Sequence, residues 1–146
     1  MGRQGAILED NAARVAEMRA CLAEVLPGVP VVFFENAMEM ISWLEQHLGE
    51  VVLISLDHDL PFLDGSGRPI DCGDGRMVAD FLAATPPTCP VIVHSSNNNC
   101  APGMFFALEE SGWPVTRVVP YEDHTWVRGA WLPHLQQLKR SEWLIP

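Results

Sequence analysis

The acidic residues that follow two apolar runs have the types and spacing of a cation-binding site. The apolar run 51–56 ends at Asp57, and the earlier run 5–8 ends at Glu9 and Asp10. If these runs form neighbouring strands, at least three carboxylates meet at one edge of a sheet. So much negative charge in a small space requires a bound cation or shifted pKa values. The three carboxylates could hold Mg²⁺, which prefers oxygen ligands and keeps waters that a phosphate can replace.

Two histidines accompany these acids. His58 follows Asp57 directly, and His94 ends the apolar run 91–93. Hydrolysis of a phosphodiester needs a positioned water and a proton donor for the leaving alkoxide, and histidine can act as base or acid near neutral pH. Both histidines are therefore candidate catalytic residues, and which of them is the acid stays open. Asp59 could orient a histidine or join the metal shell.

Polar side chains that follow His94 suit the binding of phosphate oxygens. Ser95 and Asn97 could donate hydrogen bonds to such oxygens, and they could partly replace a cation. Arg68 is the nearest obvious cation that could fold over an anion. These residues complete a predicted site for a metal ion and a small phosphoester.

Each candidate also has a purely structural interpretation. Asp57 could be a solvated carboxylate at a strand end, and His94 could be a hydrogen-bonded histidine of the core. Glu9 and Asp10 could simply favour the positive end of the helix that follows them. The charged residues interpreted as surface or structural residues are Arg14, Arg128, His47, His124 and His134.

The elements that must position these residues alternate between strand and helix. Apolar runs typical of buried strands lie at about 5–9, 30–35, 51–57, 90–93 and 115–119. Asn11 and Asn36 could cap the first two helices, and Pro27-Gly28 ends the first of them. The apolar residues expected on the helix faces are Val15, Met18, Leu22 and Val25; Met38, Ile41, Leu44 and Leu48; Met77, Val78, Phe81 and Leu82; and Met104, Phe105 and Leu108.

The last helix is expected from Asp123 onward. Pro133 interrupts its pattern, which predicts a kink or a split at that point. Trp126 and Trp131 are expected to line this helix against the sheet.

Strands that are apolar on both faces and alternate with amphipathic helices predict an α/β fold with a parallel sheet covered on both sides. With five strands and right-handed crossovers, the leading topology is a single doubly wound, flavodoxin-like domain over residues 1–146 with strand order 2-1-3-4-5. The topological switch of that order lies between the first and third strands. These are the strands that end in Glu9-Asp10 and Asp57, so the fold and the acidic cluster point to the same edge.

Composition sets limits on class and partners. The chain has 146 residues, 48% of them hydrophobic and 19% charged, and a formal net charge of −10, which argues against unspecific binding to nucleic acid. No apolar run approaches 18 residues and no leader-like segment opens the sequence, so we expect a cytoplasmic protein without a membrane span. Four scattered cysteines without a CxxC pair indicate free thiols: Cys21, Cys72, Cys89 and Cys100.

The stretch Asp57-x-x-Leu60-Pro61-x-x-Asp64-Gly65 resembles the D-x-x-[ML]-P-x-x-[DN]-G signature of response-regulator receiver domains. In that family an acidic pair such as Glu9-Asp10 binds metal, and a Thr or Ser at the position of Ser95 senses the phosphoryl group. The resemblance implies a flavodoxin-like, receiver-type fold. It also implies a Mg²⁺ (or Mn²⁺) site made by Glu9, Asp10 and Asp57 with a backbone carbonyl near Asp59.

The sequence departs from ordinary receivers in ways that alter the expected chemistry. The stretch 119–121 (Val-Pro-Tyr) lacks the lysine that receivers carry after the last strand, and residues 66–73 form an added loop. The combination LDHDL, a later Asp-Gly and His-Ser-x-Asn at 94–97 is similar to the cyclic-phosphate-processing receiver branch. That resemblance implies a receiver fold turned into a metal-dependent enzyme.

Three functions follow as hypotheses. The first is a metal-dependent phosphoesterase that processes a cyclic phosphate or another small phosphoester. The second is a signalling receiver that accepts a phosphoryl group on Asp57, and the third is a degenerate receiver that only binds other proteins. The expected ligand is a small phosphorylated molecule, with nucleic acid as a ligand only through a terminal cyclic phosphate. A homodimer or a protein partner stays open.

Overall fold

The structure is a computed structural model, which describes residues 3–57, 74–95, 101–121 and 123–140. Strands and helices alternate along this part of the chain. The strands are β1 (Gln4–Leu8), β2 (Val31–Phe34), β3 (Val51–Leu56), β4 (Val91–His94) and β5 (Val115–Val118). The helices are α1 (Ala12–Val25), α2 (Ala37–His47), α3 (Asp74–Ala83), α4 (Ala101–Glu110) and α5 (Leu132–Arg140), with a 3-10 turn η1 (Leu48–Glu50) and a π-helical turn η2 (Val127–Trp131).

The five strands form one parallel sheet in the order β2-β1-β3-β4-β5, which confirms the predicted topology. Leu8 of β1 pairs with Leu56 of β3, so these two strands end at the same level. The backbone N–H of Asp57 donates to the carbonyl of Leu8 over 3.1 Å. This register sets Glu9 and Asp57 next to each other at the carboxyl edge of the sheet.

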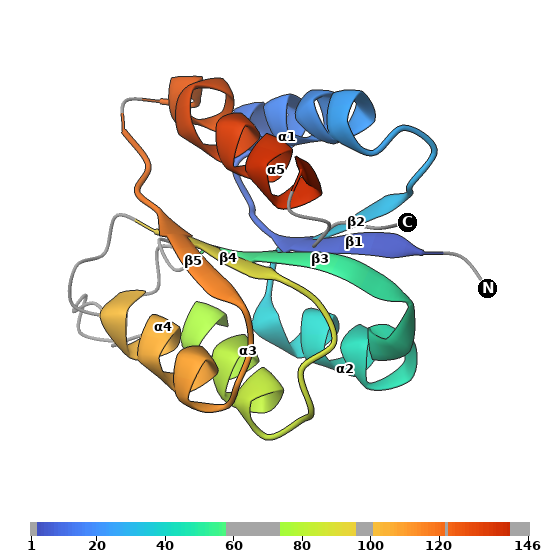
Figure 1. Ribbon diagram of the computed structural model, residues 1–146, viewed down its shortest axis with the longest axis vertical. Coiled ribbons are helices and arrows are strands. Elements are labelled where there is room, and N and C mark those ends of the chain that lie inside the picture. Colours follow the sequence, from blue (N-terminus) through green and yellow to red (C-terminus); the bar gives the residue numbers. More distant parts are fainter. Residues whose placement is uncertain (1–2, 58–73, 96–100, 122, 141–146) are drawn as a thin grey trace, which may run out of the picture.

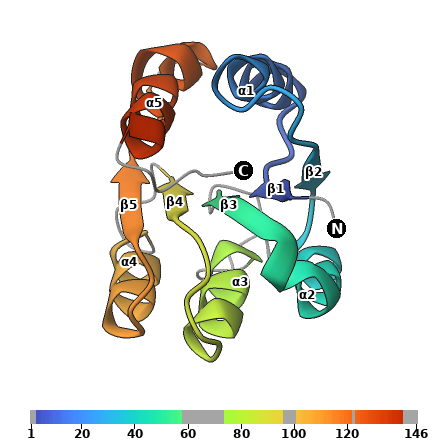
Figure 2. The same cartoon turned by 45° about the vertical axis from the view of Figure 1, so that its right-hand side comes forward.

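Helices cover both faces of the sheet. Figure 1 shows α1 and α5 on one face and α2, α3 and α4 on the other, and the turned view in Figure 2 shows the sheet between the two layers. Strand residues alternate between two apolar cores. Those in the core under α2, α3 and α4 include Ala6, Leu8, Ile54, Leu56 and Val93; those in the core under α1 and α5 include Ile7, Leu53 and Ile92.

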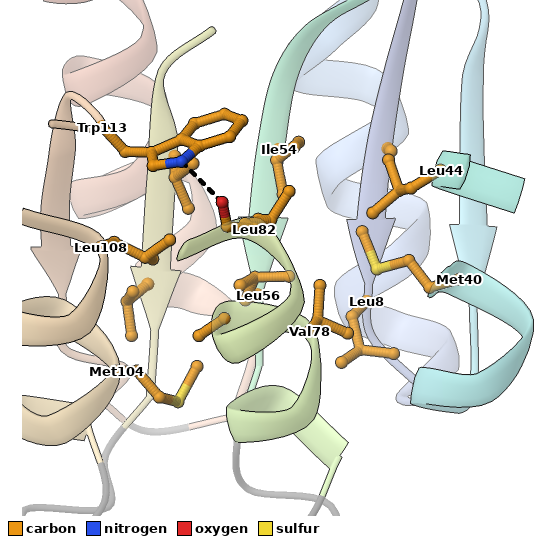
Figure 3. Packing of buried hydrophobic residues seen from close by; sticks show 14 of the residues in the cluster. Leu8, Met40, Leu44, Ile54, Leu56, Val78, Leu82, Met104, Leu108 and Trp113 are labelled. Carbon is orange, nitrogen blue, oxygen red and sulfur yellow. Dashed lines mark hydrogen bonds between the residues drawn. The ribbon is translucent and has the colours of Figure 1, made fainter. Parts of the chain in front are cut away.

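The core beneath α3 and α4 is shown in Figure 3. Leu8 and Leu56, from the two strands that end in acids, pack there with Val78 of α3 and Met104 of α4. Trp113 closes the far end of this core, where its indole N–H donates to the carbonyl of Leu82 over 2.9 Å. A close-packed apolar layer of this kind fixes the strand ends and with them the acids.

The first two helices begin where the sequence predicts. The side chains of Asn11 and Asn36 accept hydrogen bonds from the N–H groups of Arg14 and Glu39, each three residues further on. This is the usual N-cap arrangement, which satisfies one of the free N–H groups of the first turn.

On α2 and α3 one predicted core residue each is exposed, while Leu44, Val78 and Leu82 are buried as predicted. The buried stripe of α2 is Ala37, Met40 and Leu44, and Met38 is 64% exposed. On α3, Met77 is 43% exposed, while its neighbour Val78 is buried. Both helices carry adjacent apolar residues, so helical periodicity alone could not decide which of them faces the sheet.

The last helical segment changes from π-helical to α-helical geometry just before Pro133, without a break in the helix. The π-helical turn η2 comes first, and in it the N–H of Leu132 donates to the carbonyl of Val127. Pro133 is the second residue of α5, directly after this turn. Trp126 and Trp131 are fully buried against the sheet, as predicted. Among the described helices, none is both long and apolar enough to cross a bilayer.

Candidate functional site

Three polar side chains from neighbouring strand ends meet in the interior of the protein. Glu9 follows β1, Asp57 follows β3, and His94 ends β4; each is at most 1% exposed. One side-chain ligand atom from each residue lies within 4.8 Å of those from the other two. The ends of the first and third strands therefore lie close together, as predicted, and the fourth strand contributes His94 to the same group.

Glu9 is held by hydrogen bonds on both carboxylate oxygens. Its Oε2 accepts from the backbone N–H of Asn11 over 3.0 Å, and its Oε1 lies 3.1 Å from Nε2 of His94. Burial by itself raises the pKa of Glu9, but the hydrogen bond from His94, the Asn11 N–H and the charge of Arg14 together lower that pKa below its ordinary value. The carboxylate is thus ionised and fixed in orientation.

A chain of hydrogen bonds supports His94 from behind. The indole N–H of Trp131 donates to Oγ of Ser55 over 3.1 Å, and this Oγ lies 2.6 Å from Nδ1 of His94. An indole N–H can only donate, so Ser55 accepts from Trp131 and its own hydroxyl hydrogen is available for Nδ1. Nε2 of His94 then carries the proton that it donates to Glu9. In this arrangement both ring nitrogens of His94 have partners, and the η2 turn is connected to the acidic cluster.

Arg14 lies at the site and not on the open surface, which corrects the sequence interpretation of this residue. Its Nη1 atom is 3.8 Å from Oε1 of Glu9 and 4.0 Å from Oδ2 of Asp57, and its side chain is only 17% exposed. Its guanidinium lies 5.3 Å from the ring centroid of Trp126, and its Nε donates to the carbonyl of Asp123 over 3.3 Å. The first turn of α1 thus brings a cation to the two acids. Arg128 is half exposed, as predicted, and pairs with acids of α1.

The same Trp126 ring also packs on His94. The two ring centroids lie 5.6 Å apart at an interplanar angle of 26°. One buried indole therefore contacts both the imidazole and the guanidinium of the site.

Gly75 allows α3 to begin directly beside Asp57. A Cβ atom at this position would lie 2.5 Å from the backbone oxygen of Asp57 and 2.9 Å from Cε of Met104. Only glycine permits so close an approach. Gly75, in the first turn of α3, thus packs against the backbone of the central acid.

The remaining described candidates lie at the margin of this group. Ser95 is buried, and its carbonyl accepts from Nη2 of Arg117 over 3.1 Å. Asp10 is exposed and does not belong to the group defined by Glu9, Asp57 and His94. Partial burial and the charge of Glu9 raise the pKa of Asp10. The metal-binding role of Asp10 and the phosphate-binding role of Ser95 stay predictions.

Several predicted residues lie outside the described part of the chain: His58, Asp59, Arg68 and Asn97. The residues directly after β5 are Val119, Pro120 and Tyr121, and none of these three is a lysine. The one lysine in the sequence, Lys139, donates to the carbonyl of Val25 at the end of α1 remote from Glu9. A lysine therefore does not accompany Glu9 and Asp57.

The donor set fits a hard divalent cation. Glu9 and Asp57 offer carboxylate oxygens, the ligands that Mg²⁺ and Mn²⁺ prefer. His94 offers one further ligand atom, but its Nε2 would first have to leave Glu9. A thiolate site is not formed by the described cysteines Cys21 and Cys89, since burial raises their pKa values to about 11 and about 12.

Sequence reasoning missed three members of this site. Ser55 carried a signal, because it is the one polar residue in the apolar run 51–56. Arg14 carried a weaker one, since it lies in the first turn of the helix that follows Glu9 and Asp10. Trp131 carried none, because its contact with Ser55 depends on how the η2 turn packs on the sheet.

Comparisons with solved structures find the same fold in response regulators. The phosphorylated cyanobacterial phytochrome response regulator RcpA is 20% identical with a TM-score of 0.68, over 99% of this chain and 95% of that one. The Mn²⁺-bound response regulator Rcp1 is 19% identical with a TM-score of 0.61, over 96% and 94%. A receiver domain from Rhodospirillum rubrum is 12% identical with a TM-score of 0.62, over 98% and 95%.

At these identities the structural likeness shows the fold alone, and the comparison with curated proteins gave no match. The family comparison is more specific. A sequence model described as "Cyclic-phosphate processing Receiver domain" matches residues 7–110, which include the end of β1, all of β3 and β4, and the three buried polar residues of the site. This confirms the resemblance drawn from the LDHDL and His-Ser-x-Asn motifs, and the chain belongs to the family of cyclic-phosphate-processing receiver domains.

Proposed function

We propose that this protein is a divalent-metal-dependent phosphoesterase that acts on a cyclic phosphate or another small phosphoester. The observation that carries the proposal is the buried meeting of Glu9, Asp57 and His94 at the topological switch of the sheet. Two buried carboxylates suit a metal-bound phosphoester, and the family's description names the same substrate class.

Glu9 and Asp57, with Asp10 at the margin, would hold Mg²⁺ or Mn²⁺, the second of which is bound by the receiver-fold protein Rcp1. When bound, the cation supplies charge neutralisation for the phosphoryl oxygens. Asn11 and His94 fix the orientation of the Glu9 carboxylate by hydrogen bonds to its two oxygens. Fixed ligands of this kind lower the cost of arranging the site during the reaction.

The reaction adds water to the phosphorus and breaks one ester P–O bond. A base takes a proton from the attacking water, and an acid gives a proton to the leaving alkoxide, so the charges balance. His58 and His94 are the predicted base and acid, and Asp59 is predicted to orient one of them. Because both nitrogens of His94 already have partners, we propose that His94 first positions Glu9. Proton transfer then falls mainly to His58.

The ligand is proposed to be a small phosphorylated molecule. Ser95 and Asn97 would donate hydrogen bonds to its phosphate oxygens. The formal net charge of −10 opposes long polyanions, so a nucleic acid would enter only by a terminal cyclic phosphate.

A phospho-accepting receiver is the second candidate. The position of Asp57 at the end of β3 and the pattern through Gly65 favour it. The lack of a lysine directly after β5 opposes it, because no ammonium group from that strand end would then pair with a transferred phosphoryl group.

The test is a turnover assay on a panel of 2′,3′-cyclic nucleotides and other cyclic phosphates with Mg²⁺ and with Mn²⁺. We expect turnover of at least one compound, its loss in Asp57→Asn, and its retention in Asp80→Asn, an exposed carboxylate of α3 paired with Arg76. No turnover with either ion would contradict the proposal. Incubation with acetyl phosphate, followed by intact mass measurement, tests the second candidate, which requires a stable phosphoryl adduct that Asp57→Asn abolishes.

A further inference from the structure

The guanidinium of Arg14 is placed beside the two buried acids without being hydrogen-bonded to either. The distances of 3.8 Å to Glu9 and 4.0 Å to Asp57 exceed the range of an N–H···O hydrogen bond. Of the five N–H donors of the group, the Nε–H is the one that donates to a described residue, the carbonyl of Asp123. The cation is therefore close enough to act on the acids electrostatically while it keeps donors for a further acceptor.

Arg14 is also held in place from two sides. The guanidinium lies over the Trp126 ring, and the Asp123 carbonyl fixes its Nε. Trp126 itself is fully buried and packs on His94. A long side chain that is already immobilised loses little further entropy when it binds a ligand. The side chain still keeps 17% of its surface exposed, so a ligand that approaches the acids from solvent can reach it.

The charges indicate what kind of ligand fits. A divalent cation balances the carboxylates of Glu9 and Asp57, and Arg14 offsets the charge of Asp10 beside them. An anionic phosphodiester would then meet the cation and the guanidinium at an edge that no longer carries a net negative charge. A planar guanidinium also matches two oxygens of one phosphate group.

On the basis of the proposed function, we propose that Arg14 binds a phosphate oxygen of the ligand beside the metal, and that it takes the place of the lysine missing after β5. The residue thus supplies the cation from the first turn of α1 and not from β5. This assigns a substrate-binding role to a residue of α1 that the sequence places outside the site.

The test separates binding of the anion from binding of the metal. Calorimetry gives the affinity for Mg²⁺ and then, at saturating Mg²⁺, the affinity for inorganic phosphate. The variants are Arg14→Ala, Arg14→Lys and the control Arg19→Ala. Arg19 lies on the same helix but is exposed, and its guanidinium lies 4.7 Å from the ring centroid of Phe33. Because both residues are arginines, Arg19→Ala changes the net charge of the protein by the same amount as Arg14→Ala.

We expect Arg14→Ala to weaken phosphate binding at least about tenfold, the size of one charge-assisted hydrogen bond. Its Mg²⁺ affinity should stay equal or rise, because a competing cation near the two carboxylates is gone. Arg14→Lys should bind phosphate with intermediate affinity, and Arg19→Ala should match the wild type. Retained Mg²⁺ binding in Arg14→Ala also shows that the variant is folded at the site.

Equal phosphate affinity of Arg14→Ala and Arg19→Ala would overturn the inference and leave the proposed function standing. Loss of Mg²⁺ binding together with phosphate binding in Arg14→Ala and Arg14→Lys would overturn it in favour of a structural role for Arg14. If the wild type binds neither Mg²⁺ nor phosphate, the proposed function is overturned and the inference with it.

Discussion

The hydroxyl oxygen of Ser55 lies 2.6 Å from Nδ1 of His94, in a part of the sheet where both residues are fully buried. This contact joins two neighbouring strands, β3 and β4, by side chains as well as by their backbone ladder. Each of the two residues has a further hydrogen-bond partner: Ser55 accepts from Trp131 of the η2 turn, and His94 is bonded to Glu9 at the end of β1. The acidic cluster is therefore tied to the last helical segment by a continuous row of polar groups inside an apolar interior.

Removal of the Ser55 hydroxyl should cost more than one ordinary hydrogen bond. In Ser55→Ala the Trp131 N–H and Nδ1 of His94 both lose their partner in the interior. Each buried group left unsatisfied costs about 1–3 kcal/mol, so we expect the free energy of unfolding to fall by about 2 kcal/mol or more. Urea unfolding followed by circular dichroism measures it.

Ser111→Ala is the matched control for this change. The Ser111 hydroxyl donates to the carbonyl of Ala107 one turn earlier in α4, and it is only partly buried. Its loss leaves no buried donor without a partner, and we expect a change below about 1 kcal/mol. Similar losses of stability in the two variants would contradict the importance of the buried row.

The fold and the acids could be predicted from sequence because both follow from local patterns. Apolar runs separated by helical periodicity predict parallel strands, and their carboxyl ends must meet at one edge. Glu9 and Asp57 follow such runs directly, so their approach depends only on the strand order, which the structure confirms. His94 could be placed for the same reason.

The contacts behind and beside the acids could not be predicted in this way. Arg14 lies beside Glu9 and Asp57 with its guanidinium held by Trp126 and Asp123, more than a hundred residues later in the sequence. The bond from Trp131 to Ser55 likewise depends on the π-helical turn, which no periodic pattern specifies. Long-range side-chain contacts of this kind are set by tertiary packing, and a single sequence does not encode them in its spacing.

The stability of the protein should decline in acid partly through His134. This residue of α5 is hydrogen-bonded to the Thr116 hydroxyl of β5, and burial lowers its pKa. A histidine whose pKa is lower in the folded than in the unfolded chain takes up protons more readily on unfolding. The contribution of His134 to the free energy of unfolding is therefore complete above the unfolded pKa, near 6.5. This contribution is lost as the pH falls through and below that value.

His134→Gln should flatten this dependence. We expect the free energy of unfolding, measured by urea titration from pH 8 to pH 5, to fall less steeply in the variant than in the wild type. Gln137→Ala, on an exposed position of the same helix, should keep the wild-type slope. Parallel curves for the wild type and His134→Gln would show that His134 does not contribute.

A bound divalent cation should stabilise the protein through Asp57. At a Mg²⁺ concentration one hundred times the dissociation constant, mass action adds about 2.7 kcal/mol, which raises Tm by several degrees in a domain of this size. Asp57→Asn should abolish the shift, because it removes one of the two buried carboxylates. Asp80→Asn, at an exposed position, should retain it. A shift that survives Asp57→Asn would move the metal to other residues.

A methyl group at Gly75 should disturb the site without touching any of its charges. The added Cβ of Gly75→Ala would lie 2.5 Å from the backbone oxygen of Asp57, so the start of α3 or the end of β3 must shift. Overpacking of this kind costs about 1–3 kcal/mol, and the shift should also weaken the Mg²⁺-dependent rise in Tm. Gly49→Ala is the matched control, since nothing lies within 4 Å of its Cβ position, and it should lower neither quantity. A Gly75→Ala protein with wild-type stability and an unchanged Mg²⁺ response would mean that the contact between α3 and Asp57 does not position the acid.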